Sequence, residues 1–258
     1  MTNYRITLGY DGTDYHGWQL QPGLRTIQGE VEKALAVITH KRVPVNGAGR
    51  TDAGVHALAQ TAGFRADLRL GTDELLRALN AVLPEDIRVF SVEEAPADFH
   101  PRKSALSKTY RYRICISPVH SPFIRRYAIH RPMPLDFEAM REASGLFVRE
   151  DDFSTFSSNK DKCPVRKVIR SEIVRVDDEI QYTVTAEGFL KYMVRTLAGT
   201  LLNVGRGRIR PSDIEGLFRK KARTLGAPTA PAKGLCLVEV AYPPNFSIMT
   251  SASSGGRE

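Results

Sequence analysis

The chain has 258 residues, which is long enough for one large domain or two small ones. Its 42% hydrophobic and 26% charged residues are typical of a folded globular protein, and no run approaches the roughly 20 apolar residues that a membrane-spanning helix needs. The 37 Lys and Arg residues exceed the 29 Asp and Glu residues by 8, and this net positive charge fits either a nucleic-acid partner or a solvated basic surface.

The cysteines and the first ten residues indicate the compartment. Cys115, Cys163 and Cys236 lie far apart and form no CxxC pair, so no disulfide framework is expected. The opening "MTNYRITLGY" alternates polar and apolar residues and lacks the apolar core of a signal peptide. We therefore expect a cytoplasmic protein.

The spacing of apolar residues predicts the elements of the first part of the chain. Tyr4, Ile6, Leu8 and Tyr10 alternate with other residues as in a half-buried strand, and Thr26 is a candidate N-cap. In chain order we expect a strand at 4–10, a loop at 11–23, a helix from 27, strands at 42–45 and around 58–64, a helix at 72–83, and a strand at 87–95.

The second part shows similar patterns. Tyr110, Tyr112, Ile114 and Ile116 alternate along a strand, and Ser212 with a glutamate three residues later is a candidate capping box. In chain order we expect a strand at 108–117, a helix from 136, a hairpin of strands at 167–177 and 180–188, a long helix over 188–205 with an apolar stripe that begins at Phe189, a short helix at 211–218, and a strand at 235–242.

These elements predict an α+β fold with a mostly antiparallel sheet and helices packed on one face, because several strands are joined too tightly for parallel crossovers. Two loosely similar halves are expected around a central cleft, with residues 1–105 carrying the Asp52 loop and residues 106–246 completing the cleft. The small, polar residues 247–258 are expected to form a disordered tail.

Several familiar chemistries have no sequence support. The chain contains no GxGxxG after a strand, no GxxxxGK[ST] loop and no GxSxG elbow. None of its six histidines lies in an HExxH motif or beside a cysteine pair, so nothing suggests a metal site. We expect neither a nucleotide cofactor nor a metal.

The stretch "NGAGRTDAGVHA", residues 46–57, surrounds Arg50 and Asp52 with small residues. Asp52 could merely stabilise a turn, with Arg50 as a surface charge. Alternatively, the small residues let a planar ligand approach the carboxylate, and an arginine nearby keeps that carboxylate ionised and oriented. Both interpretations are open from the residues alone.

Two other regions are candidates for binding RNA. In "SALSKTYRYR", Tyr110 and Tyr112 are interleaved with Lys108, Arg111 and Arg113, as in a strand that stacks bases and grips phosphates, although they could equally be core aromatics. Within the apolar stretch "YMVRTLAG", Arg195 either needs an anionic partner or extends its charge to the surface.

Together these motifs resemble the TruA-type tRNA pseudouridine synthases. "GAGRTDAGVHA" is similar to the catalytic signature of that family, and it is long and specific. The segments "YDGTDYHGWQLQP", "FHPRKSALSKTYRYRI", "FLKYMVRTLAGTLLNVG" and "GLCLVEVAYP" are similar to further family blocks in the expected order, over roughly residues 4 to 246.

The resemblance implies a fold, an activity and a set of site residues. It implies that Asp52 is the catalytic aspartate, that Tyr110 contacts the target base and that Arg195 pairs with the aspartate. Arg50 is then a candidate wedge or phosphate contact while the base is flipped. It also implies a homodimer without a cofactor that acts on the anticodon arm of tRNA, at uridines 38, 39 and 40.

Two other classes stay open on the residues alone. A non-catalytic RNA-binding protein would explain the positive charge and the Tyr–Arg strand, although the Asp52 signature argues against it. A different base-flipping enzyme, such as a deaminase or methyltransferase, would need zinc ligands or a glycine-rich cofactor loop, and the sequence has neither.

Overall fold

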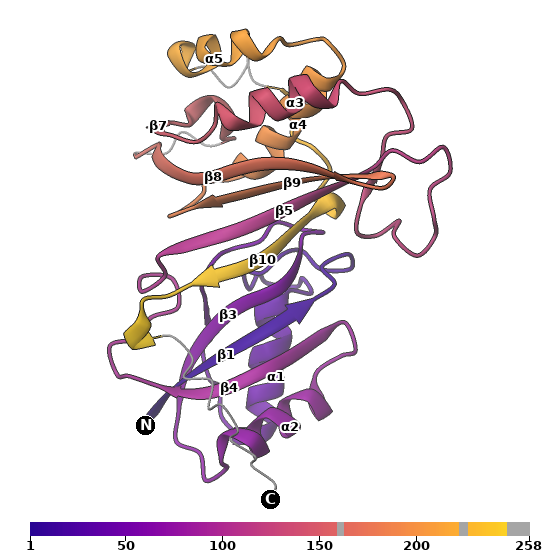
Figure 1. Ribbon diagram of the computed structural model, residues 1–258. Helices are drawn as coiled ribbons and strands as arrows, with labels where there is room; N and C mark the ends of the chain where they lie inside the picture. The colour runs from indigo at the N-terminus through magenta and orange to yellow at the C-terminus, as the bar shows by residue number, and fades with distance from the viewer. Residues whose placement is uncertain (159–162, 222–226, 247–258) are drawn as a thin grey trace, which may run out of the picture.

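A computed structural model describes residues 1–158, 163–221 and 227–246. Its centre is one long sheet that runs through the whole molecule (Figure 1). In spatial order the main path of the sheet is β4 (Ile87–Ala95), β1 (Thr2–Tyr10), β3 (His56–Ala66), β10 (Leu235–Ala241), β5 (Ser107–Cys115), β9 (Glu179–Ala186), β8 (Val165–Val176) and β7 (Glu150–Asp152).

Most neighbouring strands in this sheet are antiparallel. The short strands β2 (Asn46–Gly47) and β6 (Ile129–His130) pair with β3 and β5, respectively. Only the β10–β3 and β5–β6 pairs are parallel among the described residues. The α+β fold with a mostly antiparallel sheet, predicted from tight strand connections, is confirmed.

The first half of the sheet packs against two helices. The residues of β1 that were predicted to face one way, Tyr4 to Tyr10 at every second position, are all buried. Helix α1 (Ile27–Thr39) lies behind β1 and β3 in Figure 1, and α2 (Thr72–Val82) packs against β4. The Thr26 side chain caps α1 by accepting a hydrogen bond from the Gly29 amide at 3.2 Å, as predicted.

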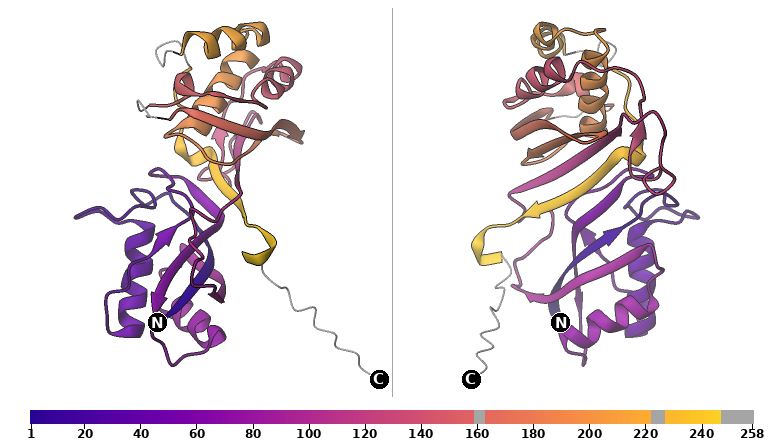
Figure 2. Two further views of the ribbon diagram at one scale, coloured as in Figure 1. Left: turned by 90° about the vertical axis from the view of Figure 1, so that its left-hand side faces the viewer. Right: turned by 45° about the vertical axis from the view of Figure 1, so that its right-hand side comes forward.

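The second half carries the remaining helices. The elements α3 (Phe137–Gly145) and α4 (Met193–Gly205) pack together, α3 against β8 and α4 against β5. The short α5 (Ile214–Lys220) lies at the end of the molecule beyond α3 (Figure 2). None of the helices in the described ranges is both long and apolar enough to span a membrane.

Strand β10 joins the two halves. It pairs in parallel with the first residues of β3, through Cys236 with His56, and antiparallel with β5, through Leu237 with Tyr110. Neighbouring strands lie about 4.8 Å apart, so the start of β3 and the middle of β5 are separated by roughly 10 Å. The loop before β3 and the Tyr110 strand therefore meet at one place in the sheet.

Three expected elements are wrong in detail. No strand forms at 42–45, where Pro44 lacks an amide hydrogen to donate, and pairing is confined to Asn46–Gly47. The long helix begins at Met193 instead of 188, because Tyr192 takes a left-handed backbone conformation with φ 62°. Ser212 caps nothing, and Glu215 instead forms an ion pair with Arg149.

The predicted division of the chain falls between two strands. Residue 105 lies in the connection from β4 to β5, and the sheet continues across both parts through β10. The predicted disordered tail, 247–258, lies outside the described residues.

Candidate active site

The loop of residues 48–55, which contains Asp52, connects β2 to β3 and packs against the loop of residues 11–23. Gly17 has φ 87°, and a side chain there would come within 2.5 Å of the Thr51 carbonyl oxygen. The Trp18 amide donates to that oxygen at 3.0 Å, and the Gly54 amide donates to the Tyr15 carbonyl at 3.3 Å. The segment 11–23 thus holds the Asp52 loop in place.

The sheet supports the same loop from the other side. The Tyr10 hydroxyl lies 2.9 Å from the Thr51 hydroxyl. The fully buried Gln60 donates from its side-chain amide to the Gly49 carbonyl at 2.8 Å. Periodicity assigned Tyr10 to the core, and nothing in the sequence singled out Gln60. Because polar groups anchor the loop on both sides, Asp52 projects from a fixed backbone.

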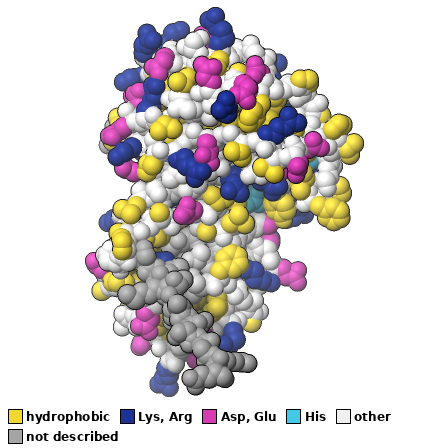
Figure 3. Space-filling model, in the orientation of Figure 1, with side chains coloured by type: hydrophobic (Ala, Val, Ile, Leu, Met, Phe, Trp, Pro, Cys, Tyr) yellow, Lys and Arg dark blue, Asp and Glu magenta, His cyan; other side chains and the backbone are white. Residues whose placement is uncertain are grey.

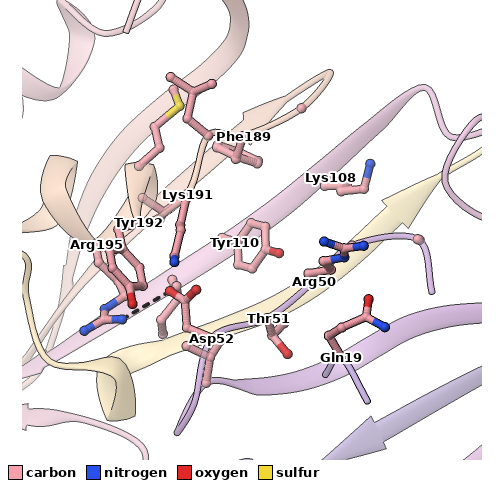
Figure 4. Close-up of a pocket in the computed structure, with 18 of the residues that line it drawn as sticks. Gln19, Arg50, Thr51, Asp52, Lys108, Tyr110, Phe189, Lys191, Tyr192 and Arg195 are labelled. Carbon is pink, nitrogen blue, oxygen red and sulfur yellow. Dashed lines mark hydrogen bonds and ion pairs between the residues drawn. The ribbon is translucent and has the colours of Figure 1, made fainter. Parts of the chain in front are cut away.

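Arg195 forms an ion pair with Asp52 (Figure 4). Its Nη1 donates to the Asp52 Oδ2 at 3.1 Å, and its Nε donates to the Ala230 carbonyl at 2.8 Å. The Asp52 and Arg195 side chains are 25% and 16% exposed, respectively. The Arg195 guanidinium also lies over the Tyr192 ring, 4.9 Å from its centroid. Within the described part of the chain, no hydrogen bond reaches the Asp52 Oδ1, so this oxygen is free to meet a substrate.

Two opposing effects act on the Asp52 carboxyl. Burial raises the pKa of Asp52, whereas the hydrogen bond and charge of Arg195, and the charge of Lys191, lower it. Burial is the larger effect, so the pKa lies above the ordinary aspartate value. The carboxylate is thus less hydrated and less stabilised than one at the surface, which makes it more basic.

Tyr110 lies on β5 in the wall of the same cavity. The residue is 7% exposed, and its ring contacts that of Phe189 edge to face, with centroids 5.2 Å apart. Among the described residues no hydrogen bond reaches its hydroxyl. Burial strongly raises the pKa of Tyr110, so the hydroxyl stays protonated at neutral pH. Tyr110 therefore offers this cavity an aromatic ring and an O–H donor.

Arg50 lies in the cavity wall but not beside the carboxylate. Figure 4 shows its guanidinium on the Lys108 side of Asp52, away from Arg195. In the described structure no ion pair joins Arg50 to Asp52, and Arg50 is an exposed residue of the cavity lining. The charged partner of Asp52 is therefore Arg195, which is distant in sequence, and not Arg50, which lies two residues before it.

The cavity has a volume of about 930 Å³. Besides Arg50, Asp52, Tyr110 and Arg195, the lining also includes Lys108, which the sequence placed on the candidate RNA-binding strand. Further lining residues were not assigned to a site from the sequence, namely Gln19, Arg166, Glu187, Phe189, Lys191 and Tyr192. Residues 188–192 were predicted as helix, so their place in the cavity wall was missed. In the part of the chain that the structure describes, no three His, Cys, Asp or Glu side chains are grouped to hold a metal ion.

Comparison with known proteins gives this geometry a family context. A family model described as tRNA pseudouridine synthase matches residues 7–102 and 143–243, which include Asp52 and Arg195. A curated protein from Caldicellulosiruptor bescii, named tRNA pseudouridine synthase A, is 43% identical over 94% of this chain and 100% of its own length. Proteins of the same name from Solibacter usitatus and Thermodesulfovibrio yellowstonii are 46% and 40% identical, with the same coverage.

Proposed function

This chain belongs to the tRNA pseudouridine synthase family, and from that membership we propose that it isomerises the uridines at positions 38, 39 and 40 of the tRNA anticodon stem-loop. The enzyme is an isomerase that makes pseudouridine in tRNA. The observation that best supports a working active site is the Asp52–Arg195 ion pair in the wall of a cavity large enough for a nucleoside.

The reaction itself explains the demands on the site. The bond from N1 of uracil to C1′ of ribose breaks, the base turns, and a bond from C5 to C1′ forms. C5 loses a proton and N1 gains one, so atoms and electrons balance without a redox cofactor or ATP. The protein must supply a group that stabilises or attacks the separated fragments, and a pocket that retains the free base.

Asp52 is the carboxylate best suited to that task. Two carboxylates line the cavity among the described residues, Asp52 and Glu187. Glu187 is 57% exposed and paired with Lys167 at 3.6 Å, so water and the lysine stabilise its negative charge. Asp52 is more buried, held through one oxygen by Arg195, and presents the other oxygen to the cavity. We assign Asp52 the catalytic role, whether it acts on the base, on C1′ or on a sugar proton.

Arg50 and Tyr110 are proposed to handle the base. A uridine must leave its stack to reach Asp52, at a cost of a few kcal/mol. The exposed Arg50, in the lining of the cavity, would fill the vacated space or hold a phosphate. The Tyr110 ring would contact the flipped base, and stacking on an aromatic ring contributes about 1–3 kcal/mol per base. The halves 1–105 and 106–246 then divide the work, since the first supplies Asp52 and the second Tyr110 and Arg195.

The Tyr110 hydroxyl is expected to assist proton movement from C5. A hydroxyl that stays protonated at neutral pH can pass its own proton toward N1, which gains one in the reaction, as it receives the proton from C5. Replacing Tyr110 by Phe should therefore lower the single-turnover rate about 100-fold, the size typical of lost proton-transfer catalysis, with tRNA affinity unchanged. Rapid-quench kinetics and filter binding measure the two quantities. Unchanged turnover would limit the contribution of Tyr110 to its ring.

The proposed target positions are tested with defined RNA. The purified enzyme is incubated with unmodified tRNA transcripts that carry uridine at 38, 39 or 40, and pseudouridine is mapped by mass spectrometry. Matched transcripts with cytidine at these positions should yield no product. Pseudouridine elsewhere in the tRNA, or none at all, would contradict the assignment.

The enzyme is also proposed to work as a homodimer in the cytoplasm, where tRNA is used. The segment between β5 and β6 projects at the right of Figure 1, and Figure 3 shows apolar side chains gathered there. Val119 and Phe123 on this segment are 77% and 88% exposed. Exposed apolar side chains that gather on one projecting segment favour a protein partner.

Changing this segment should alter the molecular mass in solution. The Phe123→Ser protein is expected to elute as a monomer at micromolar concentration, because a large apolar side chain would be lost from the interface. Light scattering after size exclusion gives the mass. Phe90→Ser removes another exposed phenylalanine, on β4, and should leave the mass of the parent. A dimer that persists in Phe123→Ser would place the contact elsewhere.

A further inference from the structure

Lys108 is a buried cation in the wall of the active-site cavity. It lies on β5 two residues before Tyr110, so both side chains are on the same face of the strand. The residue is only 8% exposed, yet it lines the cavity. In Figure 4 Lys108 and Arg50 occupy the end of the cavity opposite the Asp52–Arg195 pair.

No acidic group neutralises this lysine within the described ranges of the chain. The structure shows no ion pair or hydrogen bond of its ammonium group with those residues. Of the two carboxylates in the lining, Asp52 is paired with Arg195 and Glu187 with Lys167. Other cations line the same cavity, among them Arg50 and Arg102. Burial and the positive charge of Arg102 lower the pKa of Lys108. Because a buried, unpaired charge is costly, this arrangement favours a ligand that brings negative charge.

The chemistry of the substrate identifies that negative charge. Uracil and ribose are neutral, so the phosphodiesters are the only anions of the target nucleotide and its neighbours. Residues two apart on a strand lie about 6.6 Å apart, which places Lys108 within one nucleotide of the ring that contacts the base. A phosphate that reaches Lys108 must therefore flank the flipped nucleotide itself.

We propose that Lys108 binds a phosphate that flanks the target uridine inside the cavity, and that this contact sets the ribose with C1′ facing Asp52. The proposal rests on the proposed function and names a substrate-binding residue for it. Lys108 differs from surface cations that dock tRNA, because its contact forms only when the nucleotide has entered the cavity. Its loss should therefore affect the aligned, reacting complex more than the initial docking of tRNA.

The test pairs variants of the lysine with substrates that lack one phosphate charge. Lys108→Met keeps the length of the side chain and removes its charge, Lys108→Arg keeps the charge, and Lys41→Met removes an exposed lysine outside the cavity. Each protein is assayed on full-length tRNA, and on ligated tRNAs with a neutral methylphosphonate on the 5′ or the 3′ side of the target uridine. Single-turnover rates, tRNA affinity and melting temperature are measured for each.

Lys108→Met is expected to lower kcat/KM about 100-fold on normal tRNA, mainly through the single-turnover rate, as for a misplaced reacting group. The melting temperature should hold, because methionine fills the site without a buried charge. Lys108→Arg should recover at least part of the rate, and Lys41→Met should match the parent. With the methylphosphonate at the contacted position, the parent should lose a similar factor and Lys108→Met should lose little more.

Other results would overturn the proposal in distinguishable ways. Lys108 does not bind a flanking phosphate if Lys108→Met has the parent rate. The same conclusion follows if each methylphosphonate lowers the rate of Lys108→Met by the same factor as it lowers the rate of the parent. If the parent itself makes no pseudouridine, the proposed function fails. The same combinations of Lys108→Met with the methylphosphonate tRNAs form a double-mutant cycle. Measured as tRNA affinity, this cycle then still decides whether Lys108 and a flanking phosphate interact.

Discussion

Asp52→Asn should abolish pseudouridine formation, with a loss of about 10⁴-fold or more in the single-turnover rate, as for removal of a catalytic nucleophile. The amide keeps the shape of the side chain and can still accept from the Arg195 Nη1, but it can neither attack nor take a proton. Liquid chromatography of the nucleosides from treated tRNA measures the product.

Asp52→Asn should leave folding and binding intact. Burial raises the pKa of Asp52, which means that the ionised carboxylate is costly in the folded protein, so the melting temperature should not fall. Affinity for tRNA should hold or rise, because a negative charge facing a polyanion is removed. Glu187→Gln, in the other carboxylate of the lining, is the informative comparison. If it stopped the reaction while Asp52→Asn turned over within a few-fold of the parent, the catalytic role would belong to Glu187.

Replacing Arg195 by Met should lower activity at neutral pH about 100-fold and shift the acid limb of the pH profile upward. Arg195 lowers the pKa of Asp52, against the larger effect of burial, so its removal raises that pKa further. A larger share of Asp52 is then protonated and inactive at any given pH. In the parent, the apparent pKa of this acid limb should already lie above the ordinary aspartate value of 3.8. The plot of kcat/KM against pH gives both the loss at neutral pH and the shift of the acid limb.

The same pKa has a consequence for stability. A carboxyl whose pKa is higher in the folded than in the unfolded protein favours folding only when protonated. The free energy of unfolding contributed by Asp52 is thus present below the unfolded pKa and is lost as pH rises through the folded one. The pH range between the unfolded and folded pKa, over which this contribution is lost, should widen in Arg195→Met. In Arg195→Lys, which keeps a positive charge, it should stay close to that of the parent. An acid limb that does not move in Arg195→Met would show that the ion pair does not control Asp52.

Local patterns in the sequence were enough to predict most of the strands and helices. Alternation placed Tyr4 through Tyr10 in the core, and a threonine before a helical pattern located the start of α1. The same alternation puts Lys108 and Tyr110 on one face of β5, a relation visible in the sequence. Arg111 and Arg113 lie on the opposite face of the strand, where Arg113 forms an ion pair with Glu179.

The site could not be assembled from such patterns. Asp52 and Arg195 are 143 residues apart, and their contact depends on how β3, β10 and β5 are ordered in the sheet. Periodicity fixes which residues face the core but not which strands are neighbours, so only the family resemblance suggested the pair. The stretch 188–192 was misassigned because its apolar spacing continues that of α4, while the left-handed Tyr192 breaks the helix.

The position of β10 also determines when the enzyme can become active during its synthesis. This strand lies between β3 and β5, yet the ribosome makes it only after every helix described here. Early segments of a nascent chain can fold as they emerge, but β3 and β5 have no common neighbour until residues 235–241 follow. A nascent chain that lacks residues 235–241 therefore holds Asp52 and Tyr110 on separate pieces, and catalytic competence begins only after β10 has been made.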